Sequence, residues 1–289
     1  MKERSEGNTV LVVDAGGRGA ALVDKYAQSE HVERIIAVPG NDLMSINTDK
    51  PVQIYPQLKT TSIPEILEIC EREGVNLVDV AQDNAVEAGL VNALTERGVF
   101  TVGPTRDAGQ IEWDKAWSRE FGERHSIPQP FFRICLNKQE GFSFIQSQPD
   151  QPWFIKASGL AEGKGALPAR NNKEALERVK EMARFKEAGK VFLVEKWLRG
   201  DDGFAGEEFS TFALSDGEHY EVIGSAQDHK RVSNFDEGEN TGGMGCSTPP
   251  LVLTPDLLRD VEIVIGRAIE GLRAEGRPYR GVLYLGAGW

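Results

Sequence analysis

Largely apolar runs alternate with amphipathic segments over the first hundred residues. The runs have the length of buried strands and are too short to cross a membrane; they are Val10–Val13, Arg34–Val38, Val75–Val80 and Val99–Val102. Between them, apolar positions recur at helical spacing in Ser62–Glu73, and again at Val86, Leu90 and Leu94. Strands that alternate with helices predict a parallel sheet covered on both faces.

Two helix starts carry explicit signals. Ser62 and Glu65 have the spacing of a capping box, which predicts that a helix begins at Ser62. Thr254 followed by Pro255 is typical of another helix start. The residues that would line the buried face of this second helix are Leu258, Val261, Ile265, Ala268 and Leu272.

The pattern changes after Pro104. A helix is predicted through Ile111, Trp117 and Phe121, and it ends before the proline-rich segment Ile127–Pro130. Strand-like runs follow at Phe154–Ala157, Ala166–Ala169, Val191–Glu195, Phe209–Leu214 and Glu221–Ala226. A Ser-Asp-Gly turn separates the last two, which predicts an antiparallel pair. The fold class expected is therefore α/β followed by α+β.

The charge balance excludes some partners. The chain has 33 Lys and Arg against 45 Asp and Glu, a formal net charge of −12. Such a surface repels phosphate backbones and anionic lipids, so no nucleic acid or membrane is expected as a partner. A small phosphorylated ligand in a local basic pocket stays compatible with it.

The cysteines and the first residues bear on the compartment. The three cysteines, Cys70, Cys135 and Cys246, are odd in number and far apart, which fits neither a disulfide framework nor a metal motif. The polar start Met1–Asn8 has no signal-peptide stretch. We therefore expect reduced thiols and a cytoplasmic location.

A glycine cluster, Asp14–Gly19, follows the first predicted strand. At a helix start, backbone N–H groups and the helix dipole attract an anion, and Arg18 would add a charged contact. The cluster is not a dinucleotide fingerprint, because Leu22 stands where the last glycine belongs. A tight turn with an exposed arginine explains the same residues, so both interpretations stay open.

A second cluster, Lys156–Gly165, differs from a Walker loop, because Gly165 stands at the hydroxyl position and the glycines are too close together. Between two strand-like runs it predicts a hairpin whose N–H groups and Lys164 close over a polyphosphate. The alternative is a glycine-rich hairpin with a solvated lysine. Lys156 argues against that alternative, because a lysine inside an apolar strand needs an anion or a carboxylate partner.

Polar residues are densest near the end of a later strand. The run Gln227–Arg231 is followed by the loop Asn240–Gly245, and this combination is typical of a site for a polar, anionic ligand. A solvated surface loop is the alternative. Glu195 and the pair Glu207-Glu208 could hold the amine or ribose hydroxyls of a nucleotide. The sequence contains no HExxH, GxSxG or Cys–His signature.

Together these motifs resemble the phosphoribosylamine–glycine ligase family of the ATP-grasp superfamily. The resemblance follows the family's order over nearly the whole chain. The matching stretches are Val10–Leu22, Thr101–Lys115, Phe154–Ala166, Val191–Leu198, Ser225–Gly245 and Tyr279–Tyr284. The most specific are Gln227–Arg231 with Asn240–Gly245, and Lys156–Gly165.

The resemblance implies an ATP-grasp fold preceded by a parallel-sheet pre-ATP-grasp domain. The expected parts are the pre-ATP-grasp domain at 1–104, a helical connection at 105–130, a lid subdomain with the hairpin flap at 131–195 and a partial large subdomain at 196–289. ATP would lie between the last two.

The resemblance also implies a role for each candidate residue. Contacts to ATP would come from Lys115, Lys156, Gly159, Leu160, Ala161, Glu162, Gly163, Gly165, Glu195, Lys196, Leu198 and Glu208. Catalytic contacts would come from Lys164, Asp228, His229 and Lys230. The other substrates would meet Gly16, Gly17, Arg18, Asn240, Thr241, Gly242, Gly243, Met244 and Gly245.

The family's reaction uses ATP with Mg²⁺, for which Mn²⁺ is an alternative, to join glycine to 5-phosphoribosylamine in purine biosynthesis. The glycine carboxylate attacks the γ-phosphate, and the substrate amine then attacks the acyl phosphate. Cations that spread the phosphate charge and a flap that excludes water suit this chemistry. The expected partners are therefore these small molecules.

The chain departs from the family pattern on the substrate side. Gly19-Ala20 stands where the family has Glu-His, and Gln82–Val86 where it has Pro-Glu-x-Pro-Leu. An ATP-grasp ligase with a different amine substrate is therefore an alternative. Asp201–Gly206 adds length before Glu207, so either of the two adjacent glutamates could reach the ribose.

The family continues beyond the position of Trp289 with a Glu-Phe-Asn strand that binds the metal, so the metal ligands are unknown here. We expect the chain alone to bind ATP weakly and not to turn over, unless Glu207, Glu208, Glu239 or a partner chain completes the site. A non-catalytic, truncated nucleotide-binding protein is the third interpretation. Val282–Leu285 is expected at a sheet edge.

Overall fold

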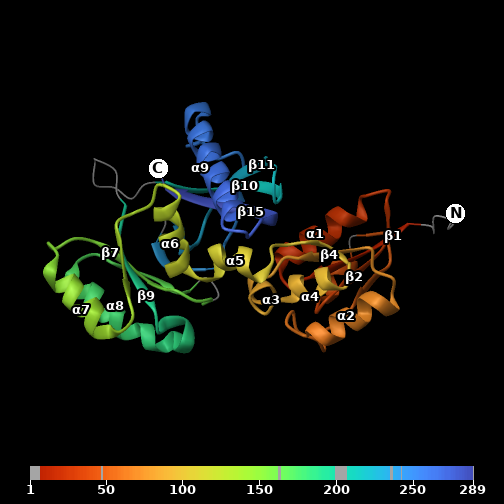
Figure 1. Ribbon diagram of the computed structural model, residues 1–289, viewed down its shortest axis with the longest axis horizontal. Helices are drawn as coiled ribbons and strands as arrows, with labels where there is room; N and C mark the ends of the chain where they lie inside the picture. The colour runs from red at the N-terminus through yellow and green to blue at the C-terminus, as the bar shows by residue number, and fades with distance from the viewer. Residues whose placement is uncertain are drawn as a thin grey trace. The chain divides into compact units, whose positions relative to one another are not determined.

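The computed structural model describes residues 7–46, 48–161, 164–198, 207–234, 237–241 and 243–288 (Figure 1). The chain divides into two compact units, Met1–Gly109 with Tyr279–Gly281 and Gln110–Pro278 with Val282–Trp289. Three candidate residues, Glu162, Gly163 and Gly242, lie outside the described residues, as does the added segment at 201–206.

The first unit is built on a five-stranded parallel sheet with the order β3-β2-β1-β4-β5. The strands are β1 (Asn8–Val13), β2 (Val32–Ala37), β3 (Val52–Ile54), β4 (Leu77–Val80) and β5 (Phe100–Val102). The connecting helices are α1 (Gly17–Ala27), η1 (Asp42–Ser45), α2 (Ile63–Arg72), α3 (Asp83–Glu87) and α4 (Leu90–Glu96). The predicted parallel sheet is confirmed. Its direction of winding changes between β1 and β4, next to the glycine cluster.

The apolar sequence of β1 explains its central position. Val10 pairs with Ile35 on one side and Leu77 on the other. Successive residues of a strand point to opposite faces, and both Leu11 and Val12 are fully buried. Both faces of the sheet at β1 are therefore covered, as expected of a parallel sheet.

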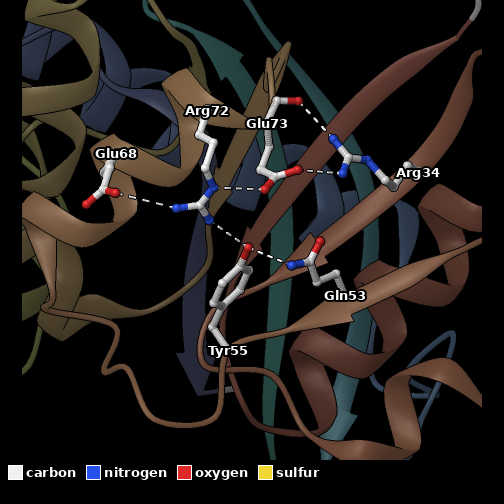
Figure 2. Close-up of polar contacts among 6 residues, drawn as sticks. All are labelled: Arg34, Gln53, Tyr55, Glu68, Arg72 and Glu73. Carbon is white, nitrogen blue, oxygen red and sulfur yellow. Dashed lines mark hydrogen bonds and ion pairs between the residues drawn. The ribbon is translucent and has the colours of Figure 1, made fainter.

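A polar network ties the C-terminal end of α2 to the sheet (Figure 2). Arg34 of β2 donates to the Glu73 carboxylate at 2.7 Å and to the Glu73 carbonyl oxygen at 2.8 Å. Arg72 donates to the same carboxylate at 3.1 Å and to the Tyr55 hydroxyl at 3.0 Å. Because the last carbonyl groups of a helix have no partner inside it, these guanidinium contacts fix where α2 ends.

The predicted helix start at Ser62 is confirmed, because Ser62 is the N-cap residue of α2, but two details of the helix signals in the first unit were wrong. Ser62 makes no side-chain capping bond to α2, and its Oγ accepts from the Lys59 N–H instead. The stripe Val86–Leu94 belongs to two helices, because Gly89 between them has a φ of 88°. Glycine adopts that left-handed conformation without the steric cost that other residues incur.

The helix predicted through Ile111, Trp117 and Phe121 is also two helices, α5 (Arg106–Trp113) and α6 (Lys115–Arg124). Asp114 separates them. Its backbone is extended, and its carboxylate accepts from the Trp117 N–H at 3.2 Å as the N-cap of α6.

The second unit contains a four-stranded antiparallel sheet with the order β6-β9-β7-β8. Its strands are β6 (Phe132–Cys135), β7 (Trp153–Ala157), β8 (Ala166–Ala169) and β9 (Phe192–Lys196). The accompanying helices are α7 (Lys138–Ser147), α8 (Asn172–Glu181) and η2 (Met182–Gly189). Ile145, Ile155 and Val194 share one buried core. Helices and sheet are therefore held together by apolar packing.

A second sheet in this unit has the order β14-β11-β10-β15. Its strands are β10 (Glu208–Asp216), β11 (Tyr220–Asp228), β14 (Cys246–Ser247) and β15 (Arg280–Gly288). The predicted antiparallel pairing of β10 with β11 is confirmed, and Val282–Leu285 lies in the terminal strand of the order. The long helix α9 (Pro255–Ala274) contacts β10 and β11 (Figure 1).

A separate two-stranded sheet pairs β12 (Arg231–Ser233) with β13 (Glu237–Asn240). None of the helices in the described ranges is long and apolar enough to cross a membrane.

Thr254→Ala is expected to destabilise the second unit. The Thr254 Oγ1 accepts from the Leu257 N–H at 3.2 Å at the start of α9, and loss of such a cap costs about 1 kcal/mol. Urea unfolding followed by circular dichroism measures the change. Thr254→Ser keeps the hydroxyl and is the control; an alanine variant as stable as the parent would show that the cap does not hold α9.

Candidate functional site

A buried carboxylate joins three elements of the second unit. Glu195 of β9 is 3% exposed and lies between Lys156 of β7 and Arg119 of α6. The Lys156 ammonium donates to Oε1 of Glu195. Arg119 donates to Oε2 from Nε at 2.9 Å and from Nη2 at 2.7 Å. Glu195 is therefore the carboxylate partner that Lys156 was predicted to need.

Strand register brings Lys156 and Glu195 together. Lys156 pairs with Leu193, and Phe154 pairs with Glu195. Lys156 and Glu195 are thus diagonal neighbours on one face of an antiparallel pair, which long side chains can bridge. Arg119 reaches the same carboxylate from the second turn of α6.

This group carries a net positive charge. Burial by itself would raise the pKa of Glu195, but the charges of Lys156 and Arg119 outweigh burial and hold that pKa below its usual range. Glu195 is therefore ionised at neutral pH, and two cations face one carboxylate.

The glycine cluster that follows β7 connects two antiparallel strands, β7 and β8, with Lys156 paired to Ala166. The predicted hairpin is therefore confirmed, and a Walker loop is excluded. Gly159 packs closely: its N–H donates to the Ala188 carbonyl at 3.1 Å, and a Cβ at 159 would lie 2.9 Å from the Ala188 Cα. Packing at the base of the hairpin thus requires this glycine. Lys164 is exposed.

Lys115 lies beside this hairpin, and Leu160 and Ala161 are part of it. Lys115 is the first residue of α6, and its N–H donates to the Ser158 carbonyl at 2.9 Å. The half-buried Ala161 accepts from the Lys164 N–H at 2.9 Å, and Leu160 precedes it. A Cβ at Gly165 would lie 2.7 Å from that of Ala161.

The polar residues at the end of β11 form a second cluster. The Lys230 Nζ lies 3.7 Å from Oε2 of Glu208 and 3.9 Å from Oδ2 of Asp228. Glu207 accepts from the Gln227 amide at 3.3 Å. Both glutamates of the adjacent pair therefore have partners on β11 or directly after it.

The glycine loop folds back onto this cluster. The His229 N–H donates to the Gly245 carbonyl at 3.0 Å, and the Met244 N–H donates to the His229 carbonyl at 2.8 Å. Thr241 donates to the Lys230 carbonyl at 2.7 Å from its N–H, and its hydroxyl accepts from the Gly243 N–H at 3.0 Å. Backbone contacts thus join two motifs that the sequence separates. Asn240 ends β13.

The first glycine cluster lies in the other unit. Gly16 is the N-cap of α1, followed by Gly17. Asp14 is completely buried; its Oδ1 accepts from the Gly16 N–H at 2.5 Å, and its Oδ2 lies 3.1 Å from the half-exposed Arg18 Nε. The Asp14 carboxylate therefore already occupies the Gly16 N–H and the Arg18 guanidinium, which a bound anion would otherwise contact.

Two further candidates end or follow β9. Lys196 is its exposed last residue, and Leu198 is 51% exposed. Lys196 still pairs with Trp153 of β7, and Leu198 follows the end of β9. Sequence reasoning missed Arg119, because nothing in the α6 sequence distinguishes it from other helix arginines.

In the part of the chain that the structure describes, no group of three or more His, Cys, Asp or Glu side chains could hold a metal ion.

Comparison with known proteins extends this description. The family model described as phosphoribosylglycinamide synthetase, N domain, matches residues 8–112, and that described as phosphoribosylglycinamide synthetase, ATP-grasp (A) domain, matches residues 113–287. The chain is 38% identical over 281 residues to the phosphoribosylamine–glycine ligase of Chlorobaculum tepidum, covering 96% of this chain and 64% of that protein.

Solved structures have the same fold. The crystal structure of a phosphoribosylamine–glycine ligase from Thermotoga maritima matches with a TM-score of 0.77 and 25% identity, covering 97% of this chain and 65% of that one. A biotin carboxylase domain from Hydrogenobacter thermophilus matches with a TM-score of 0.72 at 18% identity, over 97% of this chain and 61% of that one, which shows the fold alone. The chain therefore spans less than two thirds of the length of these relatives.

The predicted ATP-grasp fold with a preceding parallel-sheet domain is thus confirmed. Because the two family models together cover residues 8–287, with the hairpin and the Glu195 group inside the second of them, the chain belongs to the phosphoribosylglycinamide synthetase family and carries its N domain and its ATP-grasp domain.

Proposed function

We propose that this chain is the nucleotide-binding part of an ATP-dependent ligase that joins glycine to 5-phosphoribosylamine in purine biosynthesis. Family membership and the names of its relatives support the proposal. Because the chain spans 64% of the Chlorobaculum tepidum protein, we assign nucleotide binding to these residues and the complete reaction to the whole protein.

The observation that carries the proposal is the charged group beside the glycine hairpin. Lys156 and Arg119 share the single buried carboxylate of Glu195, and β7 continues from Lys156 directly into the hairpin. A partly buried positive charge next to backbone N–H groups attracts a polyphosphate, which is multiply charged and rich in acceptor oxygens. The rest of this acidic chain, with its net charge of −12, offers phosphates no general attraction.

In this proposal the phosphates contact Lys115, Lys156 and the hairpin 159–165, with Lys164 as the catalytic cation. The adenine lies along 195–198, and Glu208 reaches the ribose. The nucleotide then lies between the lid subdomain 131–195 and the part 196–289. Two cations hold the Glu195 carboxylate, and β6 and β7 pair with Glu195 on either side, so we assign the contacts with the base to the residues that follow it.

We place the other substrates near the cluster at the end of β11. Asp228, His229 and Lys230 would bind the glycine and amine groups together with the loop 240–245, which folds onto them. Gly16, Gly17 and Arg18 of the first unit would meet the phosphoribosyl group. The side chains at 228 and 230 offer one carboxylate and one cation, which suits a zwitterionic amino acid.

The proposed chemistry has two steps. A glycine carboxylate oxygen attacks the γ-phosphorus, forming an acyl phosphate and releasing ADP. The amine nitrogen then attacks the acyl carbon, phosphate leaves, and the nitrogen loses a proton. The chain's lysines stabilise charge on the transferring phosphoryl group, and the closed hairpin excludes water from the acyl phosphate.

A divalent metal accompanies ATP in enzymes of this fold, and we propose Mg²⁺, with Mn²⁺ as the alternative. Mg²⁺ binds through one or two carboxylates and substrate phosphates. The described residues do not provide a metal cluster, so no step is assigned to the metal here.

A different amine substrate is the second candidate, and the packing at Gly19 favours it. A Cβ at 19 would lie 2.6 Å from the Asp14 Cβ and 3.0 Å from the Met44 Cε. The glutamate that the family pattern has at this position therefore cannot enter without a shift of α1. This departure from the family pattern lies next to Gly16–Arg18, the residues proposed to meet the phosphoribosyl group.

We also propose a cytoplasmic location. The free thiols of Cys70 and Cys135 are buried, and burial raises the pKa of each to about 11. Cys246 is also free, and it is exposed, which fits a reducing compartment.

Calorimetric titration of the 289-residue chain with ATP tests the nucleotide site. Saturable binding at one site is expected, and the absence of binding would contradict the proposal. Turnover is then measured after fusing the chain to the C-terminal third of the Chlorobaculum tepidum ligase, with phosphoribosylamine generated in the assay. ADP formation that needs glycine, and that alanine and serine do not support, is expected; ADP formation independent of the amino acid would refute the glycine assignment.

Lys164→Ala is expected to weaken ATP binding about tenfold, because a charge-assisted contact to phosphate is lost. The unfolding midpoint should not change, since an exposed loop charge contributes little to stability. Calorimetry and thermal denaturation measure the two effects. Lys173→Ala, an exposed lysine of α8, is the control, and equal ATP affinities of Lys164→Ala and the parent would remove Lys164 from the phosphate site.

Glu195→Gln is expected to destabilise the second unit by about 3 kcal/mol at neutral pH, because it leaves two partly buried cations without their carboxylate. The folded-state pKa of Glu195 lies below its unfolded value. Its contribution is therefore fully present above about pH 4.3 and is lost as the pH falls through the folded-state pKa.

Urea unfolding at several pH values between 7 and 3 measures this difference in stability between the variant and the parent. We expect it to shrink as the solution becomes more acidic than the ordinary glutamate pKa. A difference that stays constant over this range would show that ionised Glu195 does not hold the group together.

A further inference from the structure

A residue from a distant part of the chain closes the N-terminal end of α6. Ser158, directly after β7, accepts from the Lys115 N–H with its carbonyl oxygen and from the Ala116 N–H with its Oγ, both at 2.9 Å. The Trp117 N–H donates to Oδ1 of Asp114 at 3.2 Å. Three of the N–H groups that a helix start leaves unpaired therefore have partners, two of them on Ser158.

Asp114 and Ser158 also bind each other. The Ser158 hydroxyl donates to Oδ1 of Asp114 at 2.7 Å, while Oδ2 of Asp114 accepts from the Gln110 amide at 3.2 Å. Gln110 in turn accepts from Arg277 at 2.8 Å. Ser158 is 5% exposed, so water hardly competes for a hydroxyl that donates and accepts at once. Its side chain is fixed in one orientation.

This junction lies where the candidate phosphate contacts meet. Ser158 is two residues beyond Lys156 and directly before Gly159, whose N–H is held by Ala188. On the other side of the junction, α6 begins with Lys115 and carries Arg119 one turn later. A displacement of α6 against β7 would therefore move all three cations and the base of the hairpin relative to one another.

We propose that Asp114 and Ser158 are positioning residues for the nucleotide. Their hydrogen bonds hold Lys115, Lys156 and the base of the hairpin in the arrangement that binds the phosphates, and neither residue touches the nucleotide itself. This inference rests on the proposed function. Its physical basis is pre-organisation: groups already fixed by their supporting contacts lose less freedom when the ligand binds.

Substitutions separate this role from simple helix capping. Asp114→Ser keeps a good N-cap for Trp117, but its shorter side chain does not reach Ser158. Asp114→Asn keeps one oxygen for the contacts with Trp117 and Ser158 and loses only the oxygen that accepts from Gln110. Ser158→Ala removes the connection from the other side, and Thr254→Ala is the matched control, because it removes a cap from α9 in the same unit.

Three measurements are made on each full-length variant: ATP affinity by calorimetry, the unfolding midpoint, and hydrogen exchange without nucleotide at 157–161 and 164–165. We expect Asp114→Ser and Ser158→Ala to bind ATP about tenfold more weakly and to exchange faster at the base of the hairpin. Asp114→Asn should stay within about twofold of the parent. Thr254→Ala should lower the midpoint while keeping the parental affinity and exchange.

Parental affinity in Asp114→Ser and Ser158→Ala would overturn the positioning role, and so would an equal loss of affinity in Thr254→Ala. A parent chain that binds no ATP would instead refute the proposed function. Hydrogen exchange needs no nucleotide, so in that case it still decides whether the two residues fix the hairpin, and unchanged exchange would overturn the inference independently.

Discussion

The ionised Glu195 side chain, withdrawn from water between Lys156 and Arg119, connects β9, β7 and α6 of the second unit. Removing a carboxylate from water costs several kcal/mol unless cations and hydrogen bonds replace its hydration. Both replacements come from elements that are distant in sequence, one from the neighbouring strand β7 and one from α6. The strand register and the position of α6 are therefore coupled through one side chain.

The first unit also contains buried carboxylates that hydrogen bonds hold in place. Asp14 is fully buried and holds the Gly16 N–H and the Arg18 guanidinium, so the glycine cluster has a fixed shape before any ligand arrives. Asp79 of β4 is also buried. Burial raises its pKa against the opposing hydrogen bond from Tyr26. Acidic side chains at the carboxyl ends of β1 and β4 thus shape the edge where open α/β sheets bind their ligands.

What the sequence predicted, and what it did not, follows from the range of the interactions. The alternation of apolar runs with helices predicted the parallel sheet. A strand that is buried on both faces needs apolar residues at successive positions, and the local sequence shows this directly. Lys156 predicted an anion or a carboxylate as its partner, since a charge within an apolar strand is costly. Which carboxylate is that partner depends on the pairing of strands about forty residues apart. Whether Arg119 joins the group depends on where a separate helix packs. The local sequence predicts neither.

The misjudged helices show the opposite failure, in which local signals were present but outweighed. Apolar residues recur at helical spacing from Ile111 through Trp117, so the helix break at Asp114, a good N-cap residue, was not predicted. The break at Gly89 within the stripe Val86–Leu94 was missed for the same reason. Ser62 had the right spacing but the wrong backbone conformation, with φ −78° and ψ 63°, so its hydroxyl turned to Lys59. Capping depends on backbone geometry as well as on residue type.

The occupied start of α6 has a consequence for how phosphates are attracted. Many phosphate sites use the free N–H groups and the dipole of a helix N-terminus, at short range and partly shielded from solvent ions. Here Ser158 and Asp114 already occupy those N–H groups, and a carboxylate lies at the positive end of the dipole. At this helix start the attraction therefore depends on the lysine and arginine charges, and dissolved ions screen exposed charges such as that of Lys164 beyond about 8 Å at physiological ionic strength. Under the proposed function, nucleotide capture by this chain would accordingly depend on the salt content of its surroundings.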